Sequence, residues 1–209
     1  MDIKISVKTL GKSFLVPILF NSILIPIIVI MVAKTQNEYN LLFSANVMTQ
    51  MFTPFLGSFV VFTYMSKYID TRGNEIYFVV NKNKSSEILK LYCIYIITNT
   101  FWFIVYSCLN KKFALEWVHI IILTFFYMVA TYFLCFWFKS VSLASIPIFL
   151  YTIYSIVGLE AFNSKLSYYE CCGVTGETIV SKYFYFIVAA FFLLIVGKRL
   201  NNSFEKYNE

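Results

Sequence analysis

The chain has 209 residues, of which 59% are hydrophobic and only 13% are charged. Soluble domains carry about 25% charged residues, so this composition excludes an ordinary soluble enzyme and favours a chain embedded in lipid. The formal net charge of +6 is compatible with nucleic acid or anionic lipid as a partner. The basic residues are placed as in an oriented membrane protein, so we expect membrane lipids and no nucleic acid.

Six apolar runs predict an all-α membrane protein with six transmembrane helices in a single domain, residues 1–209. A membrane helix needs about 20 mostly apolar residues, and a lysine, Lys182, interrupts only the sixth run. Strands of a membrane barrel would alternate apolar and polar residues, which these runs do not. The runs are Ser13–Ala33, Tyr39–Ser66, Leu91–Asn110, Trp117–Phe138, Ser140–Leu159 and Thr178–Gly197.

The segment before the first run, residues 3–14, predicts a helix that lies in the lipid headgroup layer. An apolar stripe at helical spacing runs beside a row of lysines, as in interfacial helices. The alternative is a charged leader to the first span; a signal peptide is disfavoured because the apolar run is too long. The stripe is Ile3, Val7, Leu10 and Phe14, and the row is Lys4, Lys8 and Lys12.

The basic residues outside the six runs form two alternating sets, and the positive-inside rule places the larger set in the cytoplasm. Both termini are then cytoplasmic, in a multi-pass protein of the cell membrane. The twelve cytoplasmic residues are Lys4, Lys8, Lys12, Lys67, Arg72, Lys82, Lys84, Lys90, Lys139, Lys198, Arg199 and Lys206. The five external residues are Lys34, Lys111, Lys112, Lys165 and Lys182.

The longest cytoplasmic connection, Lys67–Lys90, joins the second run to the third, whereas Lys139–Ser140 turns the chain within two residues. Ser85 or Ser86 is expected to cap the third helix. Two interpretations are open: an amphipathic loop on the membrane surface, or a docking helix for a cytoplasmic partner. Three apolar residues of the connection share one helical face: Ile69, Ile76 and Val80.

The last external connection, Glu160–Ser181, contains the adjacent Cys171 and Cys172, whose redox state the sequence leaves open. The lone histidine, His119, lies two residues into the fourth run, and we expect an interfacial polar residue rather than a metal ligand. No cysteine and histidine spacing of zinc type occurs. We therefore predict no metal site.

The apolar runs carry no charged residue away from their ends, and the chain contains no P-loop motif for nucleotides. We predict no catalytic residues, and uphill transport would need energy from a partner because ion-coupled transporters usually need ionisable groups at depth. The polar residues within the runs are expected to bond between helices, with contact to a substrate as the alternative. They are Asn21, Gln50, Thr98, Asn99, Thr100 and Thr124.

This order of elements resembles the membrane subunits of type-2 ABC transporters. In that family the loop between spans two and three forms a coupling helix that docks on the ATPase. The similar series here is Asp70, Gly73, Glu75, Ile76–Val80, Asn81–Ser86 and Lys90. Two features depart from the family pattern: Glu75 follows Gly73 by two residues instead of three, and the polar turn lacks proline. The resemblance implies ATPase-coupling residues at Asp70, Arg72, Gly73, Glu75, Ile76 and Phe78.

The resemblance also implies a function. Similar permeases work as two membrane subunits, identical or different, with two separate ATPase subunits that bind ATP and Mg²⁺. Small members often export amphiphilic peptides such as antimicrobial bacteriocins or give immunity to them, and others handle lipids; the substrate-binding residues, the substrate and the direction stay open. The alternatives are the substrate-binding membrane subunit of a vitamin importer, which lacks a coupling helix, and a non-transport accessory protein.

Overall fold

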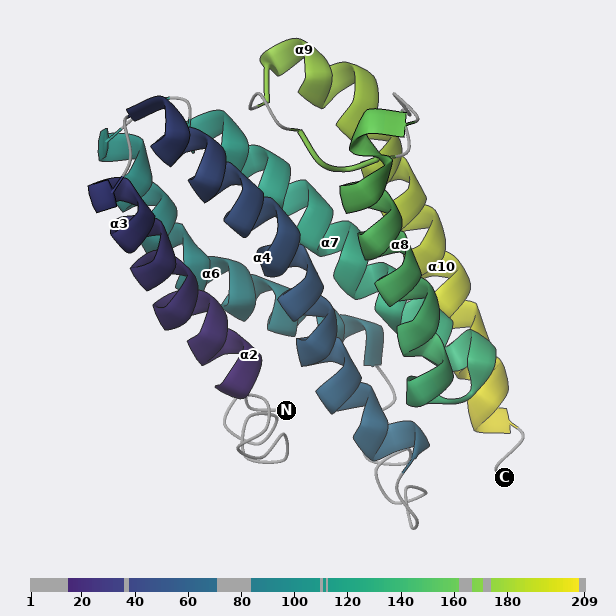
Figure 1. Ribbon diagram of the computed structural model, residues 1–209. Helices are drawn as coiled ribbons and strands as arrows, with labels where there is room; N and C mark the ends of the chain where they lie inside the picture. The colour runs from purple at the N-terminus through teal and green to yellow at the C-terminus, as the bar shows by residue number, and fades with distance from the viewer. Residues whose placement is uncertain are drawn as a thin grey trace.

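The structure, a computed structural model, describes residues 15–35, 38–70, 84–109, 111, 113–161, 167–170 and 174–206. Within these ranges the chain is all-helical and contains no β-strand, and the helices pack as a bundle with roughly aligned axes (Figure 1). In chain order the elements are α2 (Leu15–Leu19), η2 (Phe20–Leu24), α3 (Ile25–Thr35), α4 (Glu38–Ile69), α6 (Lys84–Leu109), α7 (Phe113–Phe138), α8 (Val141–Ala161), α9 (Gly176–Thr178), η3 (Ile179–Tyr183) and α10 (Phe184–Lys206).

Helix α7 lies at the centre of the bundle and contacts α4, α6, α8 and α10. Of its most apolar window 61% is buried, against 28% for α6 and 17% for the helix that contains α10. The mean hydropathies of these three helices are similar, at 2.1, 1.7 and 2.3. The central position of α7 therefore follows from packing and not from hydropathy. Among the large core side chains, Leu123, Tyr127 and Met128 of α7 are fully buried.

Four helices of the described chain are long and apolar enough to cross a membrane: Asn46–Ile69, Lys84–Cys108, Phe113–Phe138 and Gly176–Ser203. Two shorter apolar helices, Leu15–Met31 and Val141–Ile156, pack beside them. The membrane character predicted from the apolar runs is confirmed to this extent.

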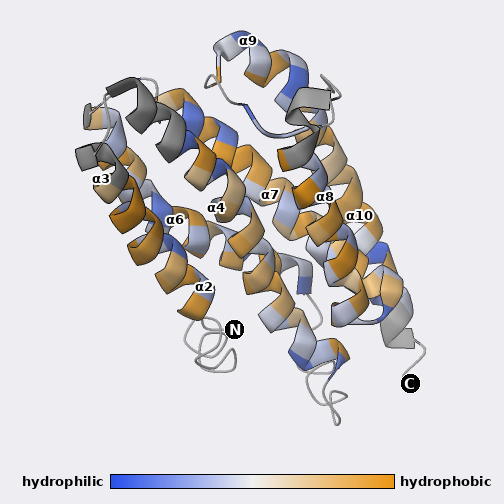
Figure 2. Ribbon diagram, viewed as in Figure 1, coloured by the Kyte–Doolittle hydropathy of each residue, from blue (hydrophilic) through white to orange (hydrophobic). Residues whose placement is uncertain are grey.

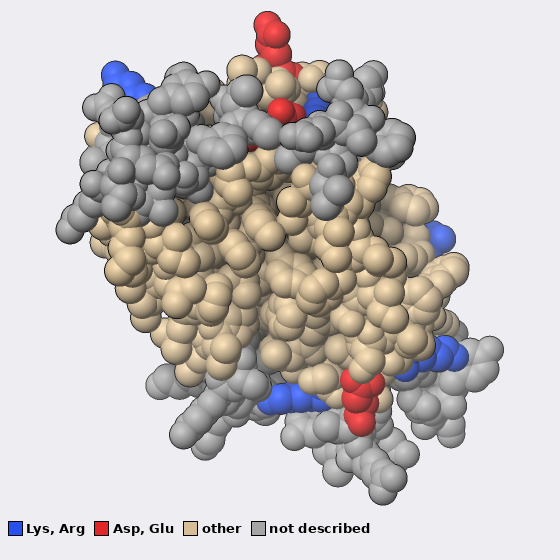
Figure 3. Space-filling view, viewed as in Figure 1, with Lys and Arg blue, Asp and Glu red and all other residues tan. Residues whose placement is uncertain are grey.

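On the face that Figure 3 shows, the middle of the bundle lacks charged side chains among the residues drawn in colour, and most charged side chains lie toward the two ends. The helices there are largely apolar (Figure 2). Large exposed apolar side chains follow one face of the last helix, among them Val180, Phe184, Val188 and Phe192. Water-soluble monomers rarely expose continuous apolar patches beyond a few hundred Å². Contact with lipid accounts for this surface.

The first helical rod widens into a π-helix, η2, immediately before Pro26. Proline has no amide proton and cannot make the usual bond to the carbonyl four residues back. One residue earlier, the amide of Ile25 donates to the carbonyl of Phe20, five residues back. This wider turn carries the buried Asn21.

The structure confirms the predicted turn between α7 and α8 and corrects the predicted start of α6. The turn predicted at Lys139–Ser140 is confirmed: α7 ends at Phe138, and Lys139 adopts a left-handed backbone with φ of 53°. Helix α6 begins at Lys84, so Ser85 and Ser86 lie inside its first turn and do not cap it. The predicted interfacial segment, residues 3–14, lies outside the described residues.

Gly197 marks the closest approach of α10 to α7. A Cβ added there would lie 2.8 Å from Cε1 of Tyr132, a side chain that is fully buried. We expect Gly197→Ala to lower stability by about 1–3 kcal/mol, the usual cost of overpacking. Thermal unfolding in detergent micelles measures the effect. Gly176→Ala is the matched control, because an added Cβ there meets nothing within 4 Å; equal stability of the two variants would contradict the prediction.

Candidate functional site

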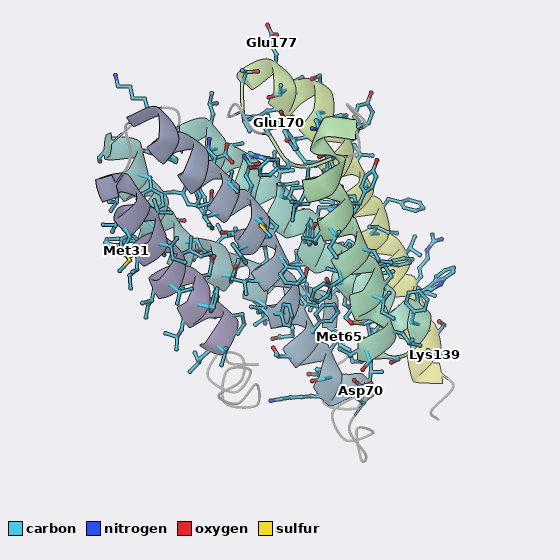
Figure 4. All side chains as sticks on the ribbon, in the orientation of Figure 1. Met31, Met65, Asp70, Lys139, Glu170 and Glu177 are labelled. Atoms are coloured by element: carbon cyan, nitrogen blue, oxygen red, sulfur yellow. The ribbon has the colours of Figure 1, made fainter. Side chains whose placement is uncertain are left out.

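A buried cluster of polar side chains lies at the end of the bundle that holds α9, here called the α9 end. It joins α4, α7, the connection 167–170 and η3. Figure 4 shows Glu170 at this end and Asp70 at the opposite end. The cluster, called the Glu116 cluster below, consists of Gln50, Glu116, His119, Glu170, Lys182 and Tyr183, together with the carbonyl of Tyr168.

Gln50 of α4 binds the backbone of Glu170 from a distance of 120 residues in the sequence. The amide of Glu170 donates to Oε1 of Gln50 at 2.9 Å, and Nε2 of Gln50 donates to the carbonyl of Glu170 at 3.3 Å. The side-chain amide of Gln50 therefore makes two hydrogen bonds with the backbone of Glu170, one as acceptor and one as donor. A connection without secondary structure is fixed to the bundle in this way.

Glu116 and His119 are three residues apart on α7, so both side chains lie on the same face of the helix. Nδ1 of His119 is 3.1 Å from Oε1 of Glu116, and Nε2 of Gln50 donates to the same oxygen at 2.7 Å. Nε2 of His119 lies 3.1 Å from the carbonyl of Tyr168. The pair thus connects three parts of the chain: α4, α7 and the connection 167–170.

The second π-helix, η3, supplies the remaining groups of the cluster. The hydroxyl of Tyr183 donates to the carbonyl of Tyr168 at 2.8 Å, and its ring centre lies 4.1 Å from that of His119. Lys182 forms an ion pair of 2.7 Å with Glu170. The lysine that interrupts the sixth apolar run is therefore neutralised by the preceding connection.

The centre of the Glu116 cluster is shielded from solvent. The side chains of His119 and Glu116 are 0% and 2% exposed, and buried polar groups at such a position depend on their hydrogen-bond partners because an unsatisfied group is costly. Within the described residues, Oε2 of Glu116 is buried without a hydrogen-bond partner. Burial raises the pKa of Tyr168 to about 12, so the phenol is neutral at physiological pH.

A second polar group ties the first rod to α4 and α6. Asn21 on η2 donates to Oδ1 of Asn99, and Thr53 donates to Oδ1 of Asn21 at 3.0 Å. The hydroxyl of Tyr95 donates to the carbonyl of Thr53 at 2.7 Å. Together with Gln50, these contacts confirm that Asn21 and Asn99 bond between helices.

Other predicted polar residues do not bond between helices in the same way. Thr98 and Thr100 donate to carbonyls one turn back in their own helix, and the buried hydroxyl of Thr124 has no partner within the described residues. Hydrogen bonds between helices in membranes contribute about 0.6 kcal/mol on average. Helix packing accounts for this group without a substrate.

Of the six predicted ATPase-coupling residues, the structure describes Asp70 alone. It follows the last residue of α4 and is exposed, at the end of the bundle opposite the Glu116 cluster. Arg72, Gly73, Glu75, Ile76 and Phe78 lie outside the described residues, as do Cys171 and Cys172. The coupling prediction therefore stays a prediction.

The first residue of α6, Lys84, lies at the same end of the bundle as Asp70. It is fully buried, and its ammonium lies 5.5 Å from the ring centre of Tyr68 on α4. Glu87 forms an ion pair of 2.8 Å with Lys90. The Lys84 contact joins α6 to α4, whereas the Glu87–Lys90 pair lies within α6.

The sequence indicated neither the burial of His119 nor its partners. We expected an interfacial polar residue, whereas the structure buries the ring completely between α7 and η3. The available signal was the spacing of Glu116 and His119, which places an acid and a base on one face of an apolar helix. No group of three or more possible metal ligands occurs within the described part of the chain.

The cluster is suited to hold a proton, because it combines a carboxylate, an imidazole and a carbonyl within hydrogen-bonding distance.

Comparison of the chain with protein-family models, with curated proteins and with solved structures finds no match.

Proposed function

We propose that this chain is the membrane-spanning permease subunit of an ATP-driven transporter similar to type-2 ABC transporters. By resemblance we propose that it exports an amphiphilic peptide or a lipid-like molecule. The observation that carries the proposal is the arrangement of α4 and α6. Helix α4 ends at Ile69 and α6 begins at Lys84, both at the same end of an apolar bundle. Residues 71–83 are left between them as a short patterned connection.

The proposed topology has six membrane spans, with both termini and residues 71–83 in the cytoplasm. Support comes from four helices of spanning length and two shorter apolar helices. The start of α2 and the end of α10 lie at the same end of the bundle (Figure 1). Lys67 lies in the last turn of α4, Lys139 follows α7 at that end (Figure 4), and Lys198 and Arg199 lie in the C-terminal part of α10. Basic residues there agree with the positive-inside rule for a cytoplasmic face.

The proposed energy source is a separate ATPase that binds ATP and Mg²⁺. The sequence contains no P-loop of the form G-x-x-x-x-G-K-[ST]. Its ionisable cluster lies near one helix end: Glu116 and His119 are the fourth and seventh residues of α7, roughly 5–9 Å from its start at 1.5 Å per residue. A proton relay across the membrane would need ionisable groups at greater depth.

The proposed assembly contains two permease subunits, identical or different, and two ATPase subunits. Alternating access is most simply built between two bundles. Each connection 71–83 would contact one ATPase and transmit its movement to α4 and α6. The packing of the buried Lys84 of α6 against Tyr68 of α4 supports this route, because it joins the two helices at the end where the connection begins and ends.

Purification in mild detergent followed by reconstitution tests the proposal. We expect the chain to co-purify with a protein that mass spectrometry identifies as carrying a nucleotide-binding P-loop. Liposomes that contain both proteins should then hydrolyse ATP faster in the presence of substrate. Uphill transport by the chain alone, driven by an ion gradient, would overturn the proposal. Tight binding of a vitamin by the isolated chain would favour the importer subunit, and absence of any ATPase partner would favour a non-transport protein.

A further inference from the structure

Residues 167–170 have no regular secondary structure, yet they are buried among the helices. Ser167 and Tyr168 are 5% and 0% exposed. The ring centre of Tyr168 lies 5.5 Å from that of Tyr127 on α7 and 6.0 Å from that of Tyr151 on α8. Connections usually run over the surface of a protein, whereas this one packs as part of the core. It is called the strap below.

The strap bonds to α8 on one side and to η3 on the other. The hydroxyl of Ser167 donates to the carbonyl of Ser155 on α8 at 3.1 Å. The hydroxyl of Tyr183 on η3 donates to the carbonyl of Tyr168 at 2.8 Å. Helix α8 packs against α4 and α7, and η3 packs against α7, α9 and α10. The strap therefore joins two elements that otherwise belong to different sides of α7.

The rest of the strap is held by separate polar contacts to α4, α7 and η3. Gln50 on α4 makes two hydrogen bonds with the backbone of Glu170. Nε2 of His119 on α7 lies 3.1 Å from the carbonyl of Tyr168. Lys182 on η3 forms an ion pair of 2.7 Å with Glu170. Because these bonds are distinct, the loss of one weakens the attachment without abolishing it.

Polar atoms beneath the strap are buried without a partner. Within the described residues, this applies to Oε2 of Glu116 and to Oγ of Ser155. The first lies beside Gln50, which bonds to the other carboxyl oxygen of Glu116 at 2.7 Å. An unsatisfied buried polar atom is costly, and water satisfies it. Removal of the strap would give water access to both atoms, so this cost opposes the contacts that hold the strap in place.

We propose that residues 167–170 are a releasable strap, which fastens α8 to η3 and covers the polar interior of the Glu116 cluster. The strap leaves as one unit, because its bonds to α4, α7, α8 and η3 fall within four consecutive residues. Its release opens the α9 end of the bundle to water between α8 and η3. This role rests on contacts within the chain and does not depend on the ATP-driven transport proposed above.

Two tyrosine variants test whether the strap leaves as a unit. Tyr183→Phe removes the hydroxyl that donates to the carbonyl of Tyr168 and lies 3.5 Å from a carboxylate oxygen of Glu170. Tyr95→Phe is the matched control. Tyr95 is also 0% exposed, and its hydroxyl donates to a backbone carbonyl, that of Thr53, at 2.7 Å, in a group of residues that does not include the strap.

The readout is hydrogen exchange at the amide of Glu170, followed by NMR on the full chain in lipid nanodiscs. This amide bonds to Gln50 and not to Tyr183, so its exchange responds to Tyr183→Phe only if the strap moves as a whole. We expect exchange to be about fivefold faster in Tyr183→Phe than in the wild type, the factor for one neutral hydrogen bond. Tyr95→Phe should exchange at the wild-type rate. Equal rates in all three proteins overturn the release of the strap as a unit.

A variant at the α8 side of the strap gives an independent test. Ser167→Ala removes the hydroxyl that donates to Ser155, and we expect the amide of Glu170 to exchange about fivefold faster in this variant too. An unchanged rate overturns the fastening to α8. If Tyr183→Phe does not fold, Ser167→Ala decides whether the strap leaves as a unit.

The covering role is tested by the reactivity of a thiol placed beneath the strap. Ser155 is 0% exposed, and Ser155→Cys is labelled with a water-soluble maleimide. Mass spectrometry of the labelled peptide distinguishes position 155 from the native cysteines. We expect slow labelling in Ser155→Cys alone, labelling about fivefold faster with Tyr183→Phe added, and no change with Tyr95→Phe added. Fast labelling in Ser155→Cys alone, or equal rates in all three proteins, overturns the covering role.

Discussion

Glu116→Leu is expected to destabilise the bundle by about 2–6 kcal/mol, because each buried polar group left without a partner costs about 1–3 kcal/mol. The substitution leaves Nδ1 of His119 and one N–H of Gln50 without their acceptor inside the protein. Leucine fills much of the volume, so the loss comes from unpaired polar groups. Thermal or denaturant unfolding of the purified protein in detergent micelles measures the change.

The control for this prediction removes both members of the pair. Phenylalanine at position 119 preserves the aromatic contact with Tyr183, and the hydroxyl of Tyr183 still satisfies the carbonyl of Tyr168. Replacement of both partners of a buried hydrogen bond by apolar groups of similar shape is often nearly neutral. Glu116→Leu with His119→Phe should therefore recover more than half of the lost stability. A single variant within about 1 kcal/mol of the wild type, or a double variant no better than the single one, would contradict this account of the contact between Glu116 and His119.

The positions of most helices could be predicted because apolar runs determine them. The residues at which the helices begin and end could not be predicted in this way. The fourth run was expected to start at Trp117, yet α7 begins at Phe113 and includes Glu116. The third was expected to start at Leu91, yet α6 begins at Lys84. A charged residue in the first turn of a helix costs little when a partner neutralises it, as Lys90 does for Glu87. Hydropathy alone does not register such pairs.

The Glu116 cluster could not be predicted because it depends on contacts between distant parts of the chain. Gln50 and Glu170 meet across 120 residues, and Tyr183 of η3 packs its ring against His119 of α7. Local spacing indicated at most that Glu116 and His119 share a helical face. Hydrogen bonds between helices were predicted for Asn21 and Asn99, but their partners were not. The partners depend on which helices become neighbours in the bundle.

A double substitution in the connection between α4 and α6, Ile76→Ala with Phe78→Ala, is expected to weaken binding to the ATPase by about 30-fold or more. Truncation of a buried interface anchor commonly costs about 2 kcal/mol, and each 1.4 kcal/mol is a factor of ten. Both residues belong to the predicted coupling segment. Titration of the purified ATPase against the permease in nanodiscs measures the affinity, and substrate-stimulated ATP hydrolysis measures the coupling.

The last helix offers a matched control for the loss of apolar surface. Val180 and Phe184 are 74% and 57% exposed on the outside of the bundle, at the end away from Asp70. Val180→Ala with Phe184→Ala removes a similar aliphatic side chain and the same aromatic ring, but from a surface that we expect to face lipid. This control variant should bind the ATPase as the wild type does. If both double variants bind and hydrolyse ATP normally, residues 76 and 78 do not dock on the ATPase, and the connection is better explained as an amphipathic loop resting on lipid headgroups. If only the Ile76 and Phe78 variant loses affinity while it still inserts and folds, the force that moves α4 and α6 enters the bundle through this connection.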